Sequence, residues 1–400
     1  GTPQPPDTPQ HRDTPSGARA RGTTPLGAAI RPFQRTGRYY GRAWRDYLRD
    51  REGTEEALPV ARPTLALATE AFRDEVVLLG LRGRRPVSDA AGFERINAEI
   101  AEALGFYGER GFLEDPEKFF AAPPPLTDVT MLPRTGRRNH DRIRWESGYE
   151  PLPGEPGGDR WQSYIANDRG YAVLLRHAEP RPWLVGVHGA EMGRAGLDLW
   201  LFRARHLHEE YGLNIVLPVL PMHGPRARGL PKGAVFPSEN VMDTLHASAQ
   251  GVWDVRRVIS WIRAQEPNSR IGLNSISMGG YIASLVASLE DGLTCAILGV
   301  PVADVVQLLG RHSGLSRTDP RWQTIELAEP LGRMTSPLSL QPRVPMRGRF
   351  IYGGIADRVV HPRRQVIRLW EHWGKPEIVW YRGGHTGFFQ ARPVQRFVEA

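Results

Sequence analysis

Residues 271–281 read I-G-L-N-S-I-S-M-G-G-Y, and this stretch decides how the rest of the chain is interpreted. Its first half has the apolar character of a buried strand, and a helical pattern begins directly after Ser277. A sharp strand-to-helix turn holds a serine hydroxyl clear of the backbone and requires small residues two positions before and after it. Ser275 and Gly279 stand there; glycine is usual at both places, and serine is a mild departure. The turn therefore indicates Ser277 as a nucleophile.

Two further polar residues follow candidate strands later in the chain. Asp357 lies in Y-G-G-I-A-D-R-V-V-H-P, and His385 lies in V-W-Y-R-G-G-H-T-G-F-F. Ligands gather at the carboxyl ends of the strands of a parallel sheet, so we expect both side chains near Ser277. A serine needs a base to take its proton, a histidine can act as that base near neutral pH, and a carboxylate orients the ring. The order Ser277, Asp357, His385 therefore predicts a catalytic triad.

Each of these residues also has a simpler interpretation. The letters around Ser277 fit a strand and a glycine-rich turn with an incidental serine. A histidine after a strand is usually structural, and an aspartate in a glycine-rich loop is usually a turn residue. Asp304, after the preceding strand, remains an alternative acid. Asp357 is preferred because the Val360 and Pro362 that follow it fit a loop that leads into a helix.

The negative charge that develops on a substrate oxygen needs hydrogen-bond donors. One is expected to be the main-chain N–H of Met278, at a helix N-terminus. The stretch W-L-V-G-V-H-G-A-E-M-G places His188, Gly189 and Ala190 after an earlier strand, and we assign the second N–H to Ala190, with Glu191 as the neighbouring option. The competing interpretation is a plain strand-ending turn.

From about residue 140, short apolar runs alternate with helical patterns. This alternation predicts an α/β fold with a mostly parallel central sheet of about eight strands, flanked by helices. The predicted strands cover residues 143–149, 171–177, 183–188, 214–219, 270–276, 295–300, 350–353 and 377–381. Residues 303–345 interrupt the rhythm with a weak helical pattern, and we expect them to form a cap-like insertion over the site.

Three parts of the chain follow from these patterns: residues 1–60, a helical extension at 61–139, and the α/β domain at 140–400. Residues 1–30 are rich in Pro, Thr, Gly and Arg and are expected to be disordered. Residues 32–50 form a basic amphipathic pattern, with arginines on one helical face and aromatic residues opposite. This helix is expected either to dock on the folded domain by its aromatic residues or, as the weaker hypothesis, to contact an anionic membrane surface.

Two helices are predicted in the extension. Residues 63–82 carry an apolar stripe, formed by Leu65, Ala68, Phe72, Val76 and Leu79. Residues 88–110 carry a second one after Ser88 and Asp89, which are candidate caps; its members are Phe93, Ile96, Ile100, Leu104 and Phe106. Both helices are expected to pack on the α/β domain.

The composition narrows the class of protein. The 400 residues carry a net charge of +8 and one cysteine, Cys295, so no internal disulfide can form. No apolar run approaches the roughly 18 residues that span a bilayer. The start of the chain lacks the apolar segment of a secretory signal, and a cytoplasmic location is expected. No nucleic-acid-binding motif accompanies the positive charge, so no nucleic-acid partner is expected.

The motifs from about residue 140 onward resemble the α/β-hydrolase superfamily. The turn at Ser277, the His-Gly loop at His188, and Asp357 and His385 occur in that superfamily's order. S-M-G-G-Y and D-R-V-V-H-P are similar to the prolyl-oligopeptidase-like and dienelactone-hydrolase-like branches, which include esterases, deacetylases and exopeptidases. Peptidases of that branch usually carry a propeller, for which the first 140 residues are too few and too helical.

The resemblance and the residues together predict a serine hydrolase acting on a small-molecule carboxylic ester, without a metal or organic cofactor. Ser277 attacks, His385 acts as base, Asp357 orients it, and the N–H groups of Met278 and Ala190 hold the oxyanion. His188, Gly189 and Gly279 support the site. The alternatives are a peptidase or amidase, an acyltransferase with the same triad, and a non-catalytic binding protein with the same fold.

Overall fold

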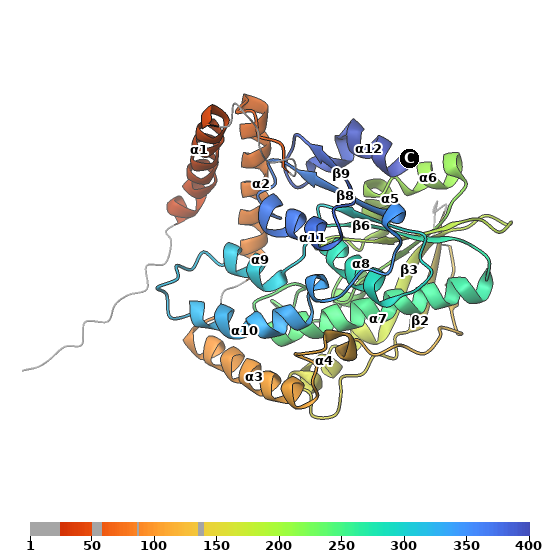
Figure 1. Cartoon of the computed structure of the whole chain (residues 1–400). Helices are drawn as coiled ribbons and strands as arrows, with labels where there is room; N and C mark the ends of the chain where they lie inside the picture. The colour runs from red at the N-terminus through yellow and green to blue at the C-terminus, as the bar shows by residue number, and fades with distance from the viewer. Residues whose placement is uncertain (1–24, 50–57, 86–87, 135–139) are drawn as a thin grey trace, which may run out of the picture.

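The computed structural model describes residues 25–49, 58–85, 88–134 and 140–400, and its centre is one sheet (Figure 1). Among the described residues the sheet has nine strands in the order β1-β2-β3-β5-β4-β6-β7-β8-β9. The strands are β1 (Thr130–Leu132), β2 (Asp141–Glu146), β3 (Arg169–Leu175), β4 (Trp183–Val187), β5 (Asn214–Pro218), β6 (Ile271–Ile276), β7 (Cys295–Gly299), β8 (Arg349–Gly354) and β9 (Glu377–Tyr381).

The sheet is parallel from β5 to β9 and antiparallel at the other edge. Strands β5, β4, β6, β7, β8 and β9 pair in parallel, whereas β1, β2 and β3 pair antiparallel with their neighbours. The predicted α/β class and the mostly parallel sheet are confirmed. The additional strand is β1, whose three residues are too few to show an alternating pattern.

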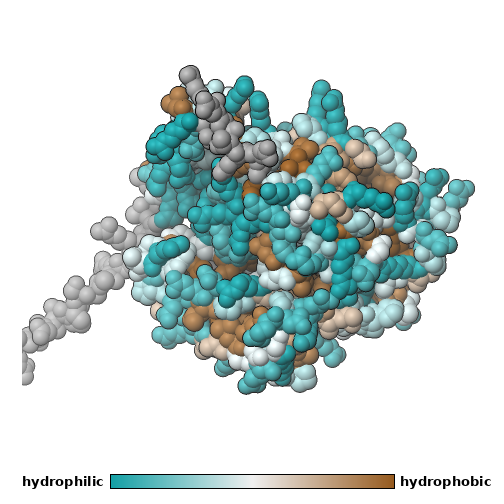
Figure 2. Space-filling view, viewed as in Figure 1, coloured by the Kyte–Doolittle hydropathy of each residue, from teal (hydrophilic) through white to brown (hydrophobic). Residues whose placement is uncertain are grey.

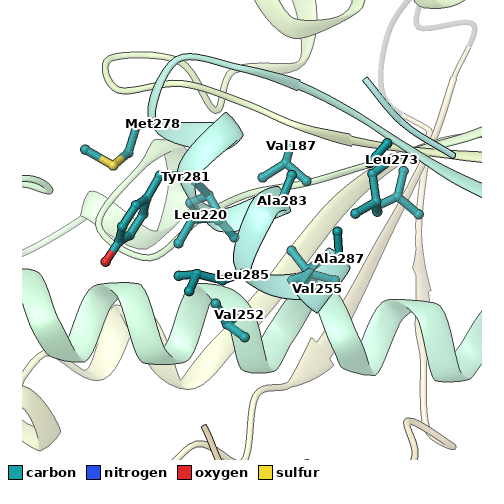
Figure 3. Packing of buried hydrophobic residues seen from close by; sticks show 14 of the residues in the cluster. Val187, Leu220, Val252, Val255, Leu273, Met278, Tyr281, Ala283, Leu285 and Ala287 are labelled. Carbon is teal, nitrogen blue, oxygen red and sulfur yellow. The ribbon is translucent and has the colours of Figure 1, made fainter. Parts of the chain in front are cut away.

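Helices cover both faces of the sheet, and their apolar side chains form two separate cores. Leu273 and Leu298 face a core shared with α7, α8 and α11, whereas Ile276 and Ile297 face one shared with α5, α6 and α12. Figure 3 shows Leu285 of α8 against Val252 of α7 in the first core. These helices are α5 (Ala195–Leu201), α6 (Ala204–Tyr211), α7 (Val241–Gln265), α8 (Met278–Leu289), α11 (Ile367–His372) and α12 (Arg392–Glu399).

Short elements connect the main ones. A short helix, α4 (Gly158–Ser163), precedes β3. Single helical turns lie at Pro116–Phe119, Ile165–Asp168, Gly224–Ala227, Pro337–Ser339, Met346–Gly348, Pro362–Val366 and Gly387–Gln390.

The interruption at residues 303–345 contains two helices, α9 (Val305–His312) and α10 (Trp322–Met334). Asp304 caps α9, because its side chain accepts a hydrogen bond from the N–H of Gln307. Such a cap contributes about 1 kcal/mol of helix stability. Ala328, Leu331 and Met334 of α10 share a core with α3 (Ala90–Glu109), so the interruption and the N-terminal extension pack together.

The N-terminal part folds into α1 (Pro25–Arg49) and α2 (Leu65–Arg84), which lie side by side in Figure 1. The expectation of disorder was wrong for residues 25–30, which begin α1; residues 1–24 and 50–57 lie outside the described part. The aromatic side of α1 docks only in part. The rings of Phe33 and Phe72 of α2 contact each other at a tilt, with centroids 4.7 Å apart, but Phe33, Trp44 and Leu48 are all exposed. Of the helices in the described ranges, none has the length and apolar character to cross a bilayer.

The apolar stripe predicted for α2 was wrong by about one residue position. Leu65 and Val76 are exposed, and the buried face consists of Leu67, Ala71, Asp74, Glu75 and Leu78. The reason is that α2 is covered on two sides, by α1 and by the loops after β8 and β9, and the second side buries two carboxylates. A pattern search that treats charged residues as exposed therefore selects the wrong face.

Candidate active site

Ser277 lies between the last residue of β6 and the first residue of α8. Its φ of 58° and ψ of −116° are rare for a residue with a side chain, and such a conformation persists only where the surroundings fix it. The N–H of Ser277 donates to the carbonyl of Gly299 at 2.8 Å, and its own carbonyl accepts from Gly280 at 2.9 Å. These bonds hold the serine hydroxyl at the end of the sheet.

The two small flanking residues have different roles. A Cβ added to Gly279 would lie 1.9 Å from the carbonyl oxygen of Val187, so no larger residue fits there without movement. Ser275 is fully buried, and its hydroxyl donates to the carbonyl of Ile297 at 3.0 Å. The departure from glycine at position 275 therefore adds a link between β6 and β7.

The structure brings Ser277, His385 and Asp357 into one hydrogen-bonded line. His385 Nε2 lies 2.9 Å from Ser277 Oγ, and His385 Nδ1 lies 2.7 Å from Asp357 Oδ2. A carboxylate only accepts, so Nδ1 carries the ring proton and Nε2 is left to accept from the serine hydroxyl. The other oxygen of Asp357 accepts from the N–H groups of Val359 and Val360, which fixes the carboxylate in its loop.

The electrostatic surroundings of His385 favour its protonated form. Burial lowers the pKa of His385. The charge and hydrogen bond of Asp357 and the charge of Asp74 raise this pKa by more than burial lowers it, so the pKa lies above that of an ordinary histidine. A raised pKa makes the ring a stronger base for the serine proton. It also means that the ring becomes neutral only at a higher pH than an ordinary histidine.

Asp304, the alternative acid, lies apart from this line. Besides capping α9, its carboxylate pairs with Arg368 at 3.1 Å. The cap of α9 and the ion pair with Arg368 account for Asp304, so its presence is explained without a role in the site.

Ala190 and Met278 line one cavity together with Ser277. Within the described part of the chain, the main-chain N–H groups of Ala190 and Met278 meet no acceptor, and Met278 opens α8. Free N–H groups at a helix start favour negative charge. Gly189 permits the close approach, because a Cβ there would lie 3.0 Å from the carbonyl oxygen of Ile276 and 3.2 Å from Ser277 Cβ.

His188 braces the loop that carries Ala190. Its Nε2 accepts from the N–H of Leu220 at 2.9 Å, and its Nδ1 therefore donates to the carbonyl of Gly189 at 2.7 Å. Burial lowers the pKa of His188 to about 4, although the bond to Gly189 opposes this. The ring stays neutral above that pH, as its accepting nitrogen requires.

Asp74 of α2 is the residue of the site that the sequence reasoning missed. Its carboxylate is fully buried and accepts from the N–H of Arg358 at 2.8 Å and from the N–H of His385 at 2.8 and 2.9 Å. It thereby joins the loop of Asp357 to the loop of His385. Burial and the nearby charge of Asp357 raise its pKa to about 7, while its hydrogen bonds and His385 oppose the rise. One feature of the sequence could have indicated Asp74: it is a charged residue on the same helical face as Leu67, Ala71 and Leu78.

The cavity at Ser277 has a volume of about 830 Å³. Its walls come from α2 (Leu78, Leu81), α3 (Ile96) and α9 (Leu308, Leu309), so both the extension and the interruption enclose it. This size lies within the usual range for small-molecule sites.

Positive charge predominates among the unpaired groups of this cavity. Arg160 is paired with Glu99 and Asp243. Arg82 lines the cavity, donates only to the carbonyl of His312, and keeps one buried terminal nitrogen, Nη2, without a partner among the described residues. Arg95 also lines the cavity, with no acceptor among the described residues.

No family model matches the chain. Two proteins of Mycobacterium tuberculosis, "Uncharacterized protein MT2702" of strain CDC 1551 and "Uncharacterized protein Rv2627c" of strain H37Rv, are each 66% identical over 376 residues, which covers 94% of this chain and 90% of theirs. Acetyl xylan esterase 1 from Thermoanaerobacterium sp. superposes with a TM-score of 0.51 at 15% identity, over 72% of this chain and 92% of that one. This likeness concerns the fold, and the chain has the α/β-hydrolase fold.

Proposed function

This chain belongs to the family of the two mycobacterial proteins, and we propose that it is a serine hydrolase that cleaves carboxylic esters. The observation that supports the proposal is the hydrogen-bonded line from Ser277 through His385 to Asp357, with Ser277 in the wall of a cavity of about 830 Å³. The motif resemblance to the dienelactone-hydrolase-like and prolyl-oligopeptidase-like branches supports the same chemistry.

In the first half of the reaction, Ser277 Oγ forms a bond to the ester carbonyl carbon while its proton passes to His385 Nε2. The carbonyl oxygen becomes an oxyanion and accepts hydrogen bonds from the N–H groups of Met278 and Ala190. Asp357 stabilises the charged ring. When the tetrahedral intermediate collapses, the bond to the alcohol oxygen breaks, and this oxygen takes the proton from His385. The acyl group remains on Ser277.

In the second half, water replaces the alcohol. His385 Nε2 takes a proton from the water as its oxygen attacks the acyl carbon, and the same two N–H groups hold the oxyanion. Collapse releases the carboxylic acid and returns the proton to Ser277 Oγ. These steps use the ester, water and groups of the chain.

The cavity favours a substrate with an apolar body and an acidic group. Leu81, Ile96 and Leu309 provide apolar walls, and the guanidinium groups of Arg82 and Arg95 are unpaired partners for an anion. A carboxylate matches the planar fork of a guanidinium. We therefore propose esters that carry a carboxylate in the acyl or alcohol part.

A fluorophosphonate probe followed by an ester screen tests the function. The wild type is expected to label on Ser277 and to hydrolyse p-nitrophenyl esters, with half-esters of dicarboxylic acids preferred over neutral esters of equal length. Amide analogues of the same acids, run in parallel, separate esterase from amidase activity.

Ser277→Ala and Ser275→Ala provide the matched pair. The first is expected to abolish labelling, and the second to retain it, because Ser275 Oγ is occupied by Ile297. A wild type that neither labels nor hydrolyses any ester, or a Ser277→Ala variant that labels like the wild type, would overturn the proposal.

A further inference from the structure

A second, smaller cavity lies beside the one at Ser277 and is lined mainly by arginines. Its volume is about 200 Å³, and it lies between α1, α2, α9 and the loop after β8. We call it the arginine cavity. Its wall consists of Arg35, Arg38, Arg42, Glu75, Leu78, Arg311, His312 and Arg358.

The positive charges of this cavity are only partly neutralised. Glu75 is the one carboxylate among the described residues of its wall, and its two oxygens lie 3.5 Å from Arg35 and 3.3 Å from Arg358. The guanidinium groups of Arg38, Arg42 and Arg311 have no acceptor among the residues that the structure describes. The part of the wall that the structure describes therefore offers five guanidinium groups and one carboxylate.

The like charges also act on one another. Burial, together with the charges of Arg358 and other nearby arginines, lowers the pKa of Arg311 to about 10, with Glu75 opposing. Arg358 is itself largely buried, with 9% of its side chain exposed, and its guanidinium carbon lies 4.8 Å from the ring centroid of Tyr39. A concave group of arginines held this close favours an anionic occupant, which would relieve the repulsion.

We propose that the arginine cavity binds a small, multiply charged phosphate anion, such as a phosphate monoester or pyrophosphate. Guanidinium groups match phosphate oxygens in pairs and stay charged at physiological pH. Three unpaired arginines from two separate helices, Arg38 and Arg42 on α1 and Arg311 on α9, converge on a volume that accommodates one or two phosphate groups. The occupant would thereby link α1 to the α/β domain.

The geometry favours a free anion over a lipid surface. The arginines of α1 that line the cavity face α9 and the loop after β8, whereas the exposed apolar side chains Phe33, Trp44 and Leu48 of the same helix do not line it. A bilayer would have to contact both sets at once, and the docked helix separates them. Figure 2 shows mostly hydrophilic side chains over α1 and α2, where grey atoms do not cover them.

The arginine cavity is distinct from the proposed ester site. The two cavities share Leu78 and His312 as a common wall, but Ser277 and Met278 line only the larger one. The phosphate site is therefore expected to bind its ligand even when the serine is removed, and the failure of one proposal does not imply the failure of the other.

Calorimetric titration of the full chain with pyrophosphate at constant ionic strength tests the proposal. The wild type is expected to bind one equivalent, and Arg42→Gln and Arg311→Gln each to weaken binding about tenfold, the effect of one charge-assisted hydrogen bond. Arg45→Gln is the matched control, because Arg45 is an exposed arginine on α1 outside the cavity. Ser277→Ala is expected to bind like the wild type.

Folding of the variants is checked by thermal unfolding without ligand, where removing Arg311 is expected to leave the midpoint unchanged or raised. Because Arg38 and Arg42 are exposed, Arg38→Gln provides a second variant whose folding is not in question. Absence of saturable wild-type binding both to pyrophosphate and to vesicles that contain phosphatidic acid, or equal weakening by Arg45→Gln and Arg311→Gln, would overturn the site.

Vesicles that contain phosphatidic acid form the second arm. If the wild type binds these vesicles but not pyrophosphate, and Arg311→Gln removes the binding, the recognised phosphate belongs to a lipid headgroup. If vesicle binding is the same in Arg311→Gln and the wild type does not bind pyrophosphate, the arginine cavity binds neither source of phosphate and the proposal is overturned.

Discussion

The sheet region and the helices that precede it contribute to the same site in different ways. The sheet region contributes the side chains of the proposed triad: Ser277, Asp357 and His385 each follow a different strand, β6, β8 and β9. The preceding helices contribute no residue to that hydrogen-bonded line. Instead α2 and α3 form walls of the cavity at Ser277, and Asp74 of α2 accepts from the main chain of the Asp357 and His385 loops.

This difference shows how one fold can acquire a distinct site. The ends of parallel strands already bring the reacting groups together, so a segment outside the sheet can shape the cavity without altering them. The carboxylate of Asp74 nevertheless reaches the centre of the site, because it is buried against two backbone N–H groups on the loops of the proposed triad. Substitutions at the strand ends and in the preceding helices can separate the two contributions.

The largest effect is expected from the nucleophile. Ser277→Ala is predicted to lower kcat by about 10⁶-fold, because without the serine hydroxyl the proposed acyl-enzyme cannot form. Ser275→Ala is predicted to retain activity and to lower the free energy of unfolding by about 1 kcal/mol, through the lost bond to Ile297. Steady-state ester hydrolysis and urea unfolding measure both. Comparable kcat values for the two variants would contradict the assignment within this turn.

A smaller effect is expected from the acid. Asp357→Asn is predicted to lower kcat about 10⁴-fold, because an amide can donate to His385 Nδ1 and favour the wrong tautomer. Asp304→Asn, the matched control, is predicted to change kcat less than about twofold. It is predicted to lower the melting temperature slightly through the lost ion pair with Arg368, because asparagine caps a helix about as well as aspartate. Comparing kcat for the two variants checks the choice between them. A larger loss of kcat in Asp304→Asn than in Asp357→Asn would show that Asp304, and not Asp357, is the acid that orients His385.

Asp74→Asn tests whether the preceding helices act on the reacting groups. Asp74 raises the pKa of His385, so removing its charge is predicted to lower that pKa. Activity requires the neutral ring, and the acid limb of the kcat/KM profile is therefore predicted to move to lower pH, with kcat reduced about tenfold by the weakened loop contacts.

Glu70→Gln is the control for Asp74→Asn, since Glu70 also lies on α2 and accepts from the N–H of Gly384 at 3.3 Å. It is predicted to leave the acid limb in place. If Asp74→Asn lowers stability but leaves the pH profile unchanged, Asp74 has a structural role alone.

The smallest effect is expected where the extension only contributes to the wall. Glu99 of α3 forms a two-point ion pair with Arg160, at 2.8 and 2.9 Å, and Arg160 also binds Asp243. Glu99→Gln is predicted to lower the free energy of unfolding by about 1 kcal/mol without changing kcat. Urea unfolding and ester kinetics measure the two quantities. A loss of kcat would show that α3 acts on the chemistry as well.

The sequence predicted the sheet and the site to different extents. The strands from β2 to β9 and the α/β class followed from the alternation of apolar runs with helices, and the α/β-hydrolase fold followed from the motifs. The structure brings Ser277, Asp357 and His385 together as the strand ends require, and their catalytic roles remain predictions. Ala190, in the glycine-containing loop after β4, lines the same cavity as Ser277, and its role as an oxyanion donor remains a prediction.

The missed features share one physical cause. Asp74 and Glu75 are buried charges, and the periodicity that identifies a helix face assumes that charges are exposed. Their partners, the N–H groups of Arg358 and His385 and the side chain of Arg358, lie in loops near the other end of the chain. A charged residue on the face of Leu67, Ala71 and Leu78 was a local signal for α2, but the partners that stabilise the buried charge could not be predicted from the local sequence, and neither could the arginine cavity.

The double covering of α2 matters for recombinant fragments. A fragment that starts at residue 140 keeps β2 to β9 and all three residues of the proposed triad. A fragment boundary chosen from the sequence motifs alone would therefore fall there. This fragment would lack Asp74, leaving two main-chain N–H groups on the loops of Asp357 and His385 without their acceptor, and Ser277 would face bulk water where α2 and α3 now stand. An inactive fragment of that kind would be evidence about these helices, and it would say nothing against Ser277.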